Sequence, residues 1–287
     1  MPLRDLEPFT ARPLDDQTRD DLAEWFAELC VAAGAVVMEV YGGSCEARLK
    51  TDQSPVTEAD ERAEAVILAG LSKRMPGWPV LAEEAAARGE MPDAAARFIL
   101  VDPLDGTREF LNRNGEFTVN IGLVADGVPV AGAVYAPVLG RLWSGGATAQ
   151  VRMVAPGAAL AQATGSRTIR TRAAPAVGLI ALASRSHGDP ETEALLSRLP
   201  VVERRAAGSS LKFCLVAEGE ADMYPRFGPT MEWDTAAGEA VLRAAGGTVL
   251  DPAGGPFRYG KAEGRYRNGP FVAWGDPAAA VRFGARG

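Results

Sequence analysis

The sequence predicts an α+β protein built from two subdomains, and three features of the chain support this fold class. Two long segments with apolar residues at helical spacing come first. A series of strand-like segments follows, two of which are joined by Asp126-Gly127, a strong signal for an antiparallel hairpin. In the second half strands and helices alternate, a pattern typical of an α/β layer. The 287 residues suffice for one large domain or two ordinary ones.

Two helices are expected near the start of the chain. Apolar side chains recur at helical spacing over residues 18–40 and again over residues 54–75. Thr57 and Asp60 have the spacing of a capping box at the start of the second helix. Helix capping is therefore one interpretation of Asp60, to be weighed against a role in a site.

Short apolar segments after the second helix predict a sheet. Residues 79–82 form a short strand that ends in Glu83-Glu84, a pair whose simplest interpretation is two solvated charges. Residues 98–101 form a buried strand, which Asp102-Pro103 is expected to end because proline cannot donate to a ladder. The further strands of an antiparallel meander are expected at 116–124, 128–136, 141–144 and 151–154.

The composition changes to Ala, Gly, Thr and Arg near residues 155–172, which predicts a boundary between subdomains 1–155 and 156–287. Asp234 directly precedes one of the helices expected beyond it, so an N-cap is one interpretation of this residue. The helices are expected at 190–199, 209–218 and 235–245. The strands are expected at 178–183, near 201, and at 221–224, 248–250 and 271–274.

The composition excludes several classes of protein. A net charge of −7 and a pI near 5.0 leave no basic stripe for a nucleic-acid polymer. Three widely spaced cysteines without a CxxC pair indicate the reducing cytoplasm rather than a disulfide framework. We expect no signal peptide and no transmembrane segment, and peripheral binding at the inner membrane stays open. The single histidine, His187, excludes multi-histidine metal sites.

The segment 102–107 follows a buried strand and carries two carboxylates three residues apart. Its proline and its Asp-Gly pair favour a turn that brings Asp102 and Asp105 together around the Leu104 carbonyl. Hard oxygen ligands of this kind suit Mg²⁺. If a helix or turn begins at Gly106, its free N–H groups offer an anion site beside the metal. The alternative is a turn with two solvated charges.

Two further carboxylates extend this pattern. Glu83 and Asp234 each stand where a regular element is expected to end or begin. Together with Asp102 and Asp105 they would form a cluster of four. A metal site beside a phosphate site indicates phosphoryl chemistry.

Eight short motifs resemble those of known enzymes. Four of them occur in this order: Val56-Thr57-Glu58-Ala59-Asp60, Glu83-Glu84, Asp102-Pro103-Leu104-Asp105-Gly106-Thr107 and Trp233-Asp234-Thr235-Ala236-Ala237-Gly238. They resemble the motifs of the inositol monophosphatase superfamily of Mg²⁺-dependent, lithium-sensitive phosphatases. The other four are Asn114-Gly115-Glu116-Phe117-Thr118-Val119-Asn120, Ser184-Arg185-Ser186-His187, Gly208-Ser209-Ser210-Leu211-Lys212-Phe213 and Tyr224-Pro225-Arg226-Phe227-Gly228. These resemble the 3′(2′),5′-bisphosphate nucleotidase branch, known as CysQ.

The resemblance implies a layered αβαβα sandwich with the active site in the cleft between its halves. It implies two or three Mg²⁺ ions, held by Glu83, Asp102, Asp105, Asp234 and the Leu104 carbonyl. Such ions lower the pKa of a water and steady the leaving oxygen. Direct transfer of the phosphoryl group to water, without a phosphoenzyme, is implied as well.

The resemblance also implies how the water and the phosphate are held. Thr107, positioned by Asp60 and assisted by Glu83, would orient or deprotonate the attacking water. The amides of Gly106 and Thr107 would hold the phosphate oxygens.

A nucleotide with two phosphates needs cations for the phosphate that is not cleaved, and Lys212 and Arg226 suit this task. In inositol monophosphatases the position that matches Arg226 is acidic and accepts sugar hydroxyls. The resemblance places His187 and Ser210 near the nucleotide. Without the resemblance, the simplest interpretations are a helix-surface lysine at 212, a turn residue at 226 and a surface-loop histidine at 187.

The resemblance therefore implies a cytoplasmic, Mg²⁺-dependent phosphatase that hydrolyses the 3′-phosphate of adenosine 3′,5′-bisphosphate to AMP and phosphate, in sulfate assimilation. It is expected to act on a small phosphorylated nucleotide, as a monomer or homodimer. One alternative is an inositol-phosphate or sugar-phosphate phosphatase of the same superfamily. Another, of a different class, is a catalytically silent nucleotide or metal sensor.

Overall fold

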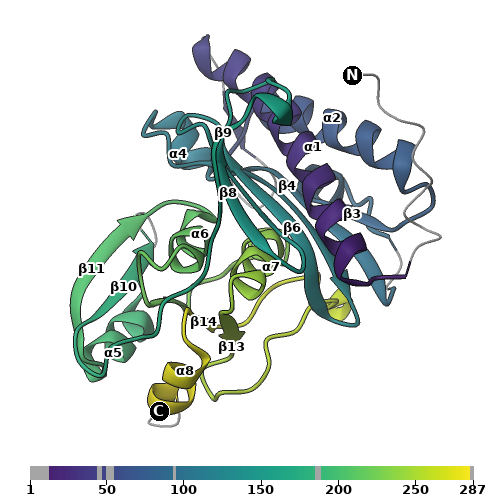
Figure 1. Cartoon of the computed structure of the whole chain (residues 1–287). Coiled ribbons are helices and arrows are strands. Elements are labelled where there is room, and N and C mark those ends of the chain that lie inside the picture. Colours follow the sequence, from purple (N-terminus) through teal and green to yellow (C-terminus); the bar gives the residue numbers. More distant parts are fainter. Residues whose placement is uncertain (1–12, 44–46, 50–54, 93–94, 185–188, 285–287) are drawn as a thin grey trace.

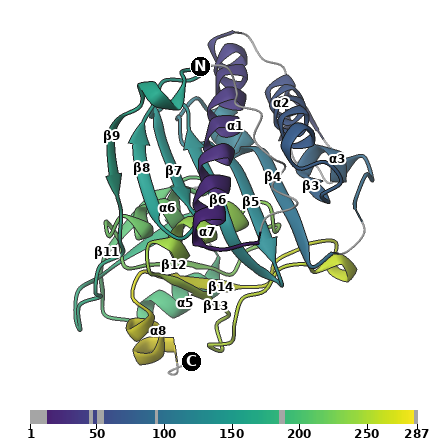
Figure 2. The same ribbon diagram turned by 45° about the vertical axis from the view of Figure 1, so that its right-hand side comes forward.

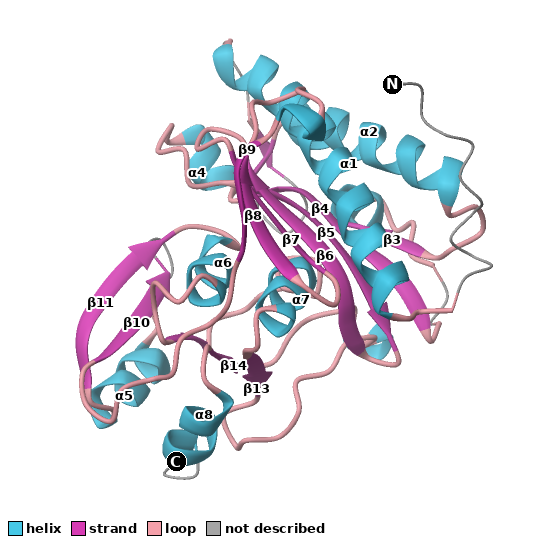
Figure 3. Cartoon of the chain, viewed as in Figure 1, coloured by secondary structure: helices cyan, strands magenta, loops and turns pink. Residues whose placement is uncertain are grey.

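A computed structural model describes residues 13–43, 47–49, 55–92, 95–184 and 189–284 (Figure 1). Layers of helices and two β-sheets alternate, as Figure 3 shows. The order of the layers is helix, sheet, helix, sheet, helix, which confirms the predicted αβαβα sandwich. Among these residues no helix is both long and apolar enough to cross a membrane.

The first sheet has seven strands in the order β3-β4-β5-β6-β7-β8-β9. Neighbouring strands are antiparallel except β3 and β4, which are parallel. Helices α1 (Asp16–Gly42) and α2 (Glu58–Arg74) cover its outer face and share an apolar core with it (Figure 2). The strands are β3 (Val80–Ala82), β4 (Arg97–Asp105), β5 (Thr118–Ala125), β6 (Val128–Ala136), β7 (Arg141–Gly145), β8 (Ala149–Met153) and β9 (Thr164–Thr168).

The second sheet has five strands in the order β11-β10-β12-β14-β13. Strand β10 is parallel to β11 and β12, whereas β14 is antiparallel to β12 and β13. Helices α5 (Pro190–Arg198) and α8 (Pro277–Gly284) pack on its outer face in a core of their own. The strands are β10 (Leu179–Ser184), β11 (Val201–Ala207), β12 (Met223–Arg226), β13 (Thr248–Leu250) and β14 (Phe271–Trp274).

The layer between the sheets consists of α6 (Leu211–Ala217) and α7 (Ala236–Ala244). Beneath α7 lie Gly122, Gly132 and Gly145, which are in register on β5, β6 and β7. A Cβ at Gly122 would lie 2.8 Å from the Ala237 nitrogen, and one at Gly145 would lie 2.6 Å from the Val241 Cα. Helix α7 therefore rests directly on the backbone of the sheet, which fixes the position of its N-terminal end.

Most elements expected from the sequence are present. The Asp126-Gly127 hairpin joins β5 to β6, with φ of +50° and +75°, the left-handed values that a two-residue hairpin turn needs. The expected capping box of Thr57 and Asp60 is formed. The apolar patterns did not indicate β9, α8 or the short elements, which are β1 (Arg48–Leu49), β2 (Pro55–Val56), α3 (Glu83–Ala87), α4 (Thr107–Leu111) and 3₁₀ turns at Leu160–Gln162 and Ala262–Gly264.

The expected end of a strand at Asp102-Pro103 is wrong, because β4 continues to Asp105. Its pairing with β5 shifts in register between Asp102 and Asp105. Pro103 lies inside this irregular stretch, where the ladder does not require a donor.

Strand β9 extends the first sheet to Thr168, into the stretch where the boundary between 1–155 and 156–287 is expected. That division of the chain stays a prediction.

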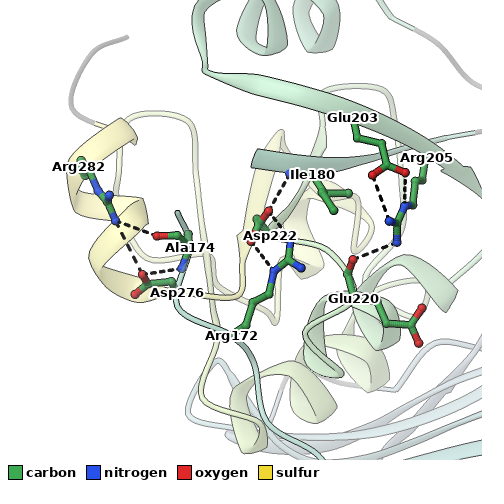
Figure 4. A network of polar contacts seen from close by, with 9 residues as sticks. All are labelled: Arg172, Ala174, Ile180, Glu203, Arg205, Glu220, Asp222, Asp276 and Arg282. Atoms are coloured by element: carbon green, nitrogen blue, oxygen red, sulfur yellow. Dashed lines mark hydrogen bonds and ion pairs between the residues drawn. The ribbon is translucent and has the colours of Figure 1, made fainter. Parts of the chain in front are cut away.

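A buried acid fastens the chain where it enters the second half (Figure 4). Arg172 donates from Nε and Nη2 to the two oxygens of Asp222, at 2.8 and 2.7 Å. The same carboxylate accepts the Ile180 N–H at 2.7 Å. Nearby, Asp276 accepts the Ala174 N–H at 3.1 Å. These contacts hold the connection after β9 against the second sheet.

Candidate active site

A cavity of about 270 Å³ lies between the two halves of the molecule. The ends of β4, β10 and β12, the start of α6 and the loop before α7 contribute to its wall. The lining includes every predicted metal ligand and both predicted cations, namely Glu83, Asp102, Leu104, Asp105, Asp234, Lys212 and Arg226. Gly106, Thr107 and Ser209 line it as well. The fold thus brings together site residues that are far apart in the sequence.

The end of β4 is shaped by contacts with its own backbone and with the second half. Asp102 Oδ1 accepts the Leu104 N–H at 3.0 Å. The Ser209 hydroxyl donates to the Asp105 carbonyl at 2.7 Å. Gly106, which directly follows Asp105, has a φ of +95°, and a Cβ there would lie 2.3 Å from Ser209 Oγ. Only glycine fits this junction, both by conformation and by space.

Asp60 is at once a capping residue and the partner of Thr107. Its Oδ2 accepts the Thr57 N–H at 2.8 Å and the Thr57 hydroxyl at 2.7 Å. Its Oδ1 lies 3.3 Å from Thr107 Oγ1, whose hydroxyl can instead donate to the Leu104 carbonyl at 3.4 Å. Asp60 is buried and stands behind Thr107 rather than in the cavity wall.

Glu83 is the first residue of α3 and lines the cavity. Its neighbour Glu84 is buried, and the Glu84 N–H donates to Glu64 Oε2 on α2 at 2.7 Å. The interpretation of two solvated charges is therefore wrong for Glu84. Helix α2 anchors the start of the short helix that presents Glu83.

Asp234 is not the N-cap of α7, because Thr235 occupies that position. Asp234 Oδ2 accepts the Met231 N–H at 2.8 Å, and its main-chain oxygen accepts the Ser210 hydroxyl at 2.7 Å. The capping interpretation is wrong, since the helix begins one residue later and the carboxylate belongs to the loop that lines the cavity.

Ser210 lies behind the cavity, and its neighbour Ser209 lines it instead. Asn120 Nδ2 on β5 donates to Ser210 Oγ at 3.1 Å and lies 3.4 Å from Asp105 Oδ2. Because the Ser210 hydroxyl donates to the Asp234 main-chain oxygen, Asn120 and Ser210 connect Asp105 in the first half to Asp234 in the second. Asn120 belongs to the motif 114–120, but no role in the site was expected for it; it reaches the site through its register opposite Asp102.

Lys212 is buried, so its interpretation as a helix-surface lysine is wrong. Its ammonium donates to the carbonyls of Ala207 and Ser209 at 3.1 and 2.7 Å. It also lies 5.0 Å from the centre of the Tyr224 ring. These contacts hold the charge at the cavity wall without pairing it to an acid.

Arg226 is the last residue of β12 and is buried, so it is not a turn residue. Its guanidinium donates to the carbonyls of Gly228 and Pro229 at 3.3 and 3.1 Å. His187, the other expected nucleotide contact, lies outside the described residues.

Burial and mutual repulsion raise the pKa values of the acidic groups. Burial, followed by the charges of Glu83 and Asp105, raises the pKa of Asp102 well above its usual range, and the same causes raise the pKa of Asp234. Burial raises the pKa of Asp105 to about 6, although Lys212 opposes the rise. Burial lowers the pKa of Lys212 to about 8. The cavity therefore holds an excess of buried acidic groups.

This set of donors fits Mg²⁺. Every donor is a hard oxygen, and acids crowded in a buried site repel one another until a cation neutralises them. Within the described residues, no three acidic, histidine or cysteine side chains are gathered closely enough to define a metal site on their own. The fit thus rests on the chemistry of the donors and on their raised pKa values, and the individual ligands stay predictions.

Comparison with known proteins agrees with this chemistry. The chain matches the inositol monophosphatase family over residues 19–279. It is 47% identical over 236 residues to the 3′(2′),5′-bisphosphate nucleotidase CysQ of Escherichia coli (strain K12), which covers 81% of this chain and 91% of that protein. It is 47% identical over 242 residues to CysQ of Salmonella typhimurium, covering 83% and 94% of the two chains. The crystal structure of CysQ from Bacteroides thetaiotaomicron, a bacterial member of the inositol monophosphatase family, aligns with a TM-score of 0.74 at 38% identity, covering 89% of this chain and 97% of the other. The chain therefore belongs to the inositol monophosphatase family.

Proposed function

We propose that this protein is a Mg²⁺-dependent 3′(2′),5′-bisphosphate nucleotidase. It hydrolyses the 3′-phosphate of adenosine 3′,5′-bisphosphate to AMP and phosphate, in sulfate assimilation, as a cytoplasmic monomer or homodimer. The observation that carries the proposal is a single cavity lined by the four carboxylates of the predicted metal site, by Glu109 and by two buried cations. The 47% identity to CysQ nucleotidases supports the same reaction.

In this proposal Glu83, Asp102, Asp105, Asp234 and the Leu104 carbonyl hold two Mg²⁺ ions, or three. Bound Mg²⁺ supplies the acidity that activates water near neutral pH and the charge that stabilises the leaving oxygen. The protein supplies oxygen donors whose positions are fixed, because each lies in the last four residues of β4, at the start of α3 or in the anchored loop before α7.

Thr107 and Asp60 are proposed to orient the attacking water. If the Thr107 hydroxyl donates a hydrogen bond to Asp60, its oxygen is free to accept a hydrogen bond from the attacking water. Asp60 keeps its orientation because Thr57 holds its other oxygen through two hydrogen bonds. Glu83 assists from the start of α3, and the amides of Gly106 and Thr107 hold the phosphate oxygens.

Lys212 and Arg226 are proposed to bind the phosphate that is not cleaved. Both donate to main-chain carbonyls, which hold these cations in place without neutralising them. A nearby phosphate would also raise the lowered pKa of Lys212. Ser209 takes the place of Ser210 in this part of the proposal, since Ser209 lines the cavity. His187 stays a predicted nucleotide contact.

Two alternatives have weaker support. An inositol-phosphate phosphatase would place an acid where Arg226 stands, because sugar hydroxyls need an acceptor. A silent sensor would not need the full set of carboxylates that lines the cavity.

The test compares phosphate release from adenosine 3′,5′-bisphosphate and from inositol 1-phosphate, with saturating Mg²⁺. We expect the wild type to prefer the nucleotide and Arg226→Glu to lower kcat/KM for the nucleotide about 100-fold, since a charge-assisted contact becomes repulsive. Arg198→Glu, an exposed position in the last turn of α5, is the control and is expected to leave the preference unchanged. A wild-type preference for inositol 1-phosphate would overturn the substrate assignment, and release from neither would overturn the function.

A further inference from the structure

We propose that Glu232 and Asn268 are positioning residues, which hold the loop that carries Asp234 in the shape that metal binding requires. The inference rests on the function proposed above, in which Asp234 is a Mg²⁺ ligand. Neither side chain lines the cavity, so each would act through Asp234. Both are buried in the protein.

Glu232 ties the loop to residues 260–261. Its carboxylate accepts the N–H groups of Gly260 at 2.8 Å and of Lys261 at 2.9 Å. The Lys261 ammonium lies 2.8 Å from Glu232 Oε1 and also packs against two aromatic rings, each with its centre 5.1 Å away. Three donors, one of them from a lysine whose side chain is 31% exposed, therefore fix a buried carboxylate that precedes Asp234 by two residues.

Asn268 holds the loop at both sides of Asp234. Its Nδ2 donates to the Met231 carbonyl at 2.7 Å and lies 3.2 and 3.0 Å from the hydroxyl oxygens of Thr230 and Thr235. The main-chain N–H of Asn268 donates to the Thr230 carbonyl at 2.9 Å. Since Thr235 is the N-cap of α7, one amide side chain bridges the residues before and after the carboxylate.

These contacts converge on Met231, the residue that orients the carboxylate. The Met231 N–H donates to Asp234 Oδ2 at 2.8 Å, while its carbonyl is held by Asn268 at 2.7 Å and by the Asp234 N–H at 3.2 Å. The neighbouring Glu232 N–H donates to the Tyr266 carbonyl at 2.9 Å. A loop fixed in this way presents Asp234 before a metal binds, and loosening it should weaken metal binding.

Glu232→Gln tests the inference, because it keeps the shape of the side chain and removes the charge that receives three donors. The first readout is the rise in melting temperature that Mg²⁺ causes without nucleotide, and the second is phosphate release against Mg²⁺ concentration. We expect the half-saturating Mg²⁺ concentration to increase about tenfold in both readouts. The KM for adenosine 3′,5′-bisphosphate at saturating Mg²⁺ should stay within about twofold of the wild-type value.

Glu218→Gln is the matched control. The Glu218 side chain is equally buried, accepts the Trp143 indole N–H at 2.7 Å and pairs with Arg141 and Arg167. It fastens the end of α6 to β7 and β9, and these hydrogen bonds and ion pairs do not involve the Asp234 loop. This variant should melt at a lower temperature and keep the wild-type half-saturating Mg²⁺ concentration.

An unchanged half-saturating Mg²⁺ concentration in Glu232→Gln, beside a normal wild-type response, would overturn the positioning role. If the wild type shows neither stabilisation by Mg²⁺ nor phosphate release, the proposed function has failed instead. Should Glu232→Gln not fold, Asn268→Ser decides in its place: a rise of about threefold supports the inference, and no rise overturns it.

Discussion

Two groups of enclosed acidic side chains in this fold differ in the charged groups that surround them. Glu218 and Asp222 each pair with arginine side chains and accept further N–H donors. Asp102, Asp105 and Asp234 form no ion pair among the described residues, and burial and neighbouring acids raise their pKa values. The first group holds layers of the fold together, and the second is the group that we propose to bind a cation.

The comparison teaches that burial alone does not say what an acid does. When a buried acid is paired with a cation, removing either partner by mutation lowers the free energy of unfolding, because the other charge is left buried and unpaired. A buried acid that faces other acids is a source of electrostatic strain. The same change, from aspartate to asparagine, should therefore have opposite effects on stability in the two groups.

The largest effect is expected for Asp105→Asn. Phosphate release should fall by about 10³-fold or more, because the change removes a charged oxygen donor from the proposed metal site. Without metal, the free energy of unfolding should increase by up to about 2 kcal/mol, since the change removes a charge that burial disfavours, although the attraction to Lys212 is lost as well. Urea unfolding in EDTA measures the second quantity. A loss of stability in EDTA would remove the distinction between the two groups.

Asp222→Asn should show the reverse pattern. The free energy of unfolding should fall by about 2 kcal/mol, less than for a fully buried pair because Arg172 is 37% exposed and can be hydrated. Phosphate release per folded molecule should stay within about twofold of wild type, as Asp222 does not line the cavity. Glu220→Gln, at a neighbouring site where the side chain is 45% exposed, is the control and should change stability by less than about 0.5 kcal/mol. Equal losses in both variants would contradict the role of the buried pair.

The smallest effect is a shift of the melting temperature with pH. The pKa of Asp105 is raised from 3.8 to about 6, so the folded protein binds this proton more tightly than the unfolded chain does. The stability of the metal-free protein should therefore rise as the pH falls through 6, and the raised pKa values of Asp102 and Asp234 act in the same direction. Lys212, with its pKa lowered to about 8, is protonated in both states well below that pH and contributes no trend there.

Thermal melting in EDTA measures this trend. We expect the melting temperature to be about 2–5 °C higher at pH 5.5 than at pH 7.5, and Asp105→Asn to show a smaller difference. Excess Mg²⁺ should reverse the trend, because protons compete with the metal for the same oxygens. A melting temperature that is lower at pH 5.5 than at pH 7.5 in EDTA would contradict the assignment of this trend to the three aspartates.

The sequence predicted those features that depend on short segments. Asp126-Gly127 has the two positive φ values that its residue types favour, and the central strands lie where alternation and branched side chains indicate them. The motifs also led to the cavity, because the carboxylates stand at element ends whose meeting the resemblance implied. Asp60 shows that two interpretations of one residue need not compete, since the residue that caps α2 also lies 3.3 Å from Thr107, and its role in the site stays a prediction.

The features that the sequence did not predict depend on contacts between distant segments. Asn120 reaches Asp105 through strand register, and Glu232 reaches its donors through a loop that follows much later in the chain. Ser209 rather than Ser210 lines the cavity, and Ser209 has a φ of +48°, which no local pattern reveals. β4 continued past Pro103 because a register shift removed the need for its missing donor.

The three glycines beneath α7 affect how near Asp234 can come to the end of β4, because they let the helix pack closely on the sheet. A methyl group at Gly122 or Gly132 would overlap the first turn of α7, and one at Gly145 would overlap residues further along the helix. Mg²⁺ demands short oxygen distances of nearly fixed geometry, whereas Ca²⁺ accepts longer and more variable ones. In the proposed site, the close packing of α7 on the glycines of three strands therefore limits the distance between Asp234 and the end of β4. We expect this distance to restrict the size of the ion that the two halves of the protein bind together.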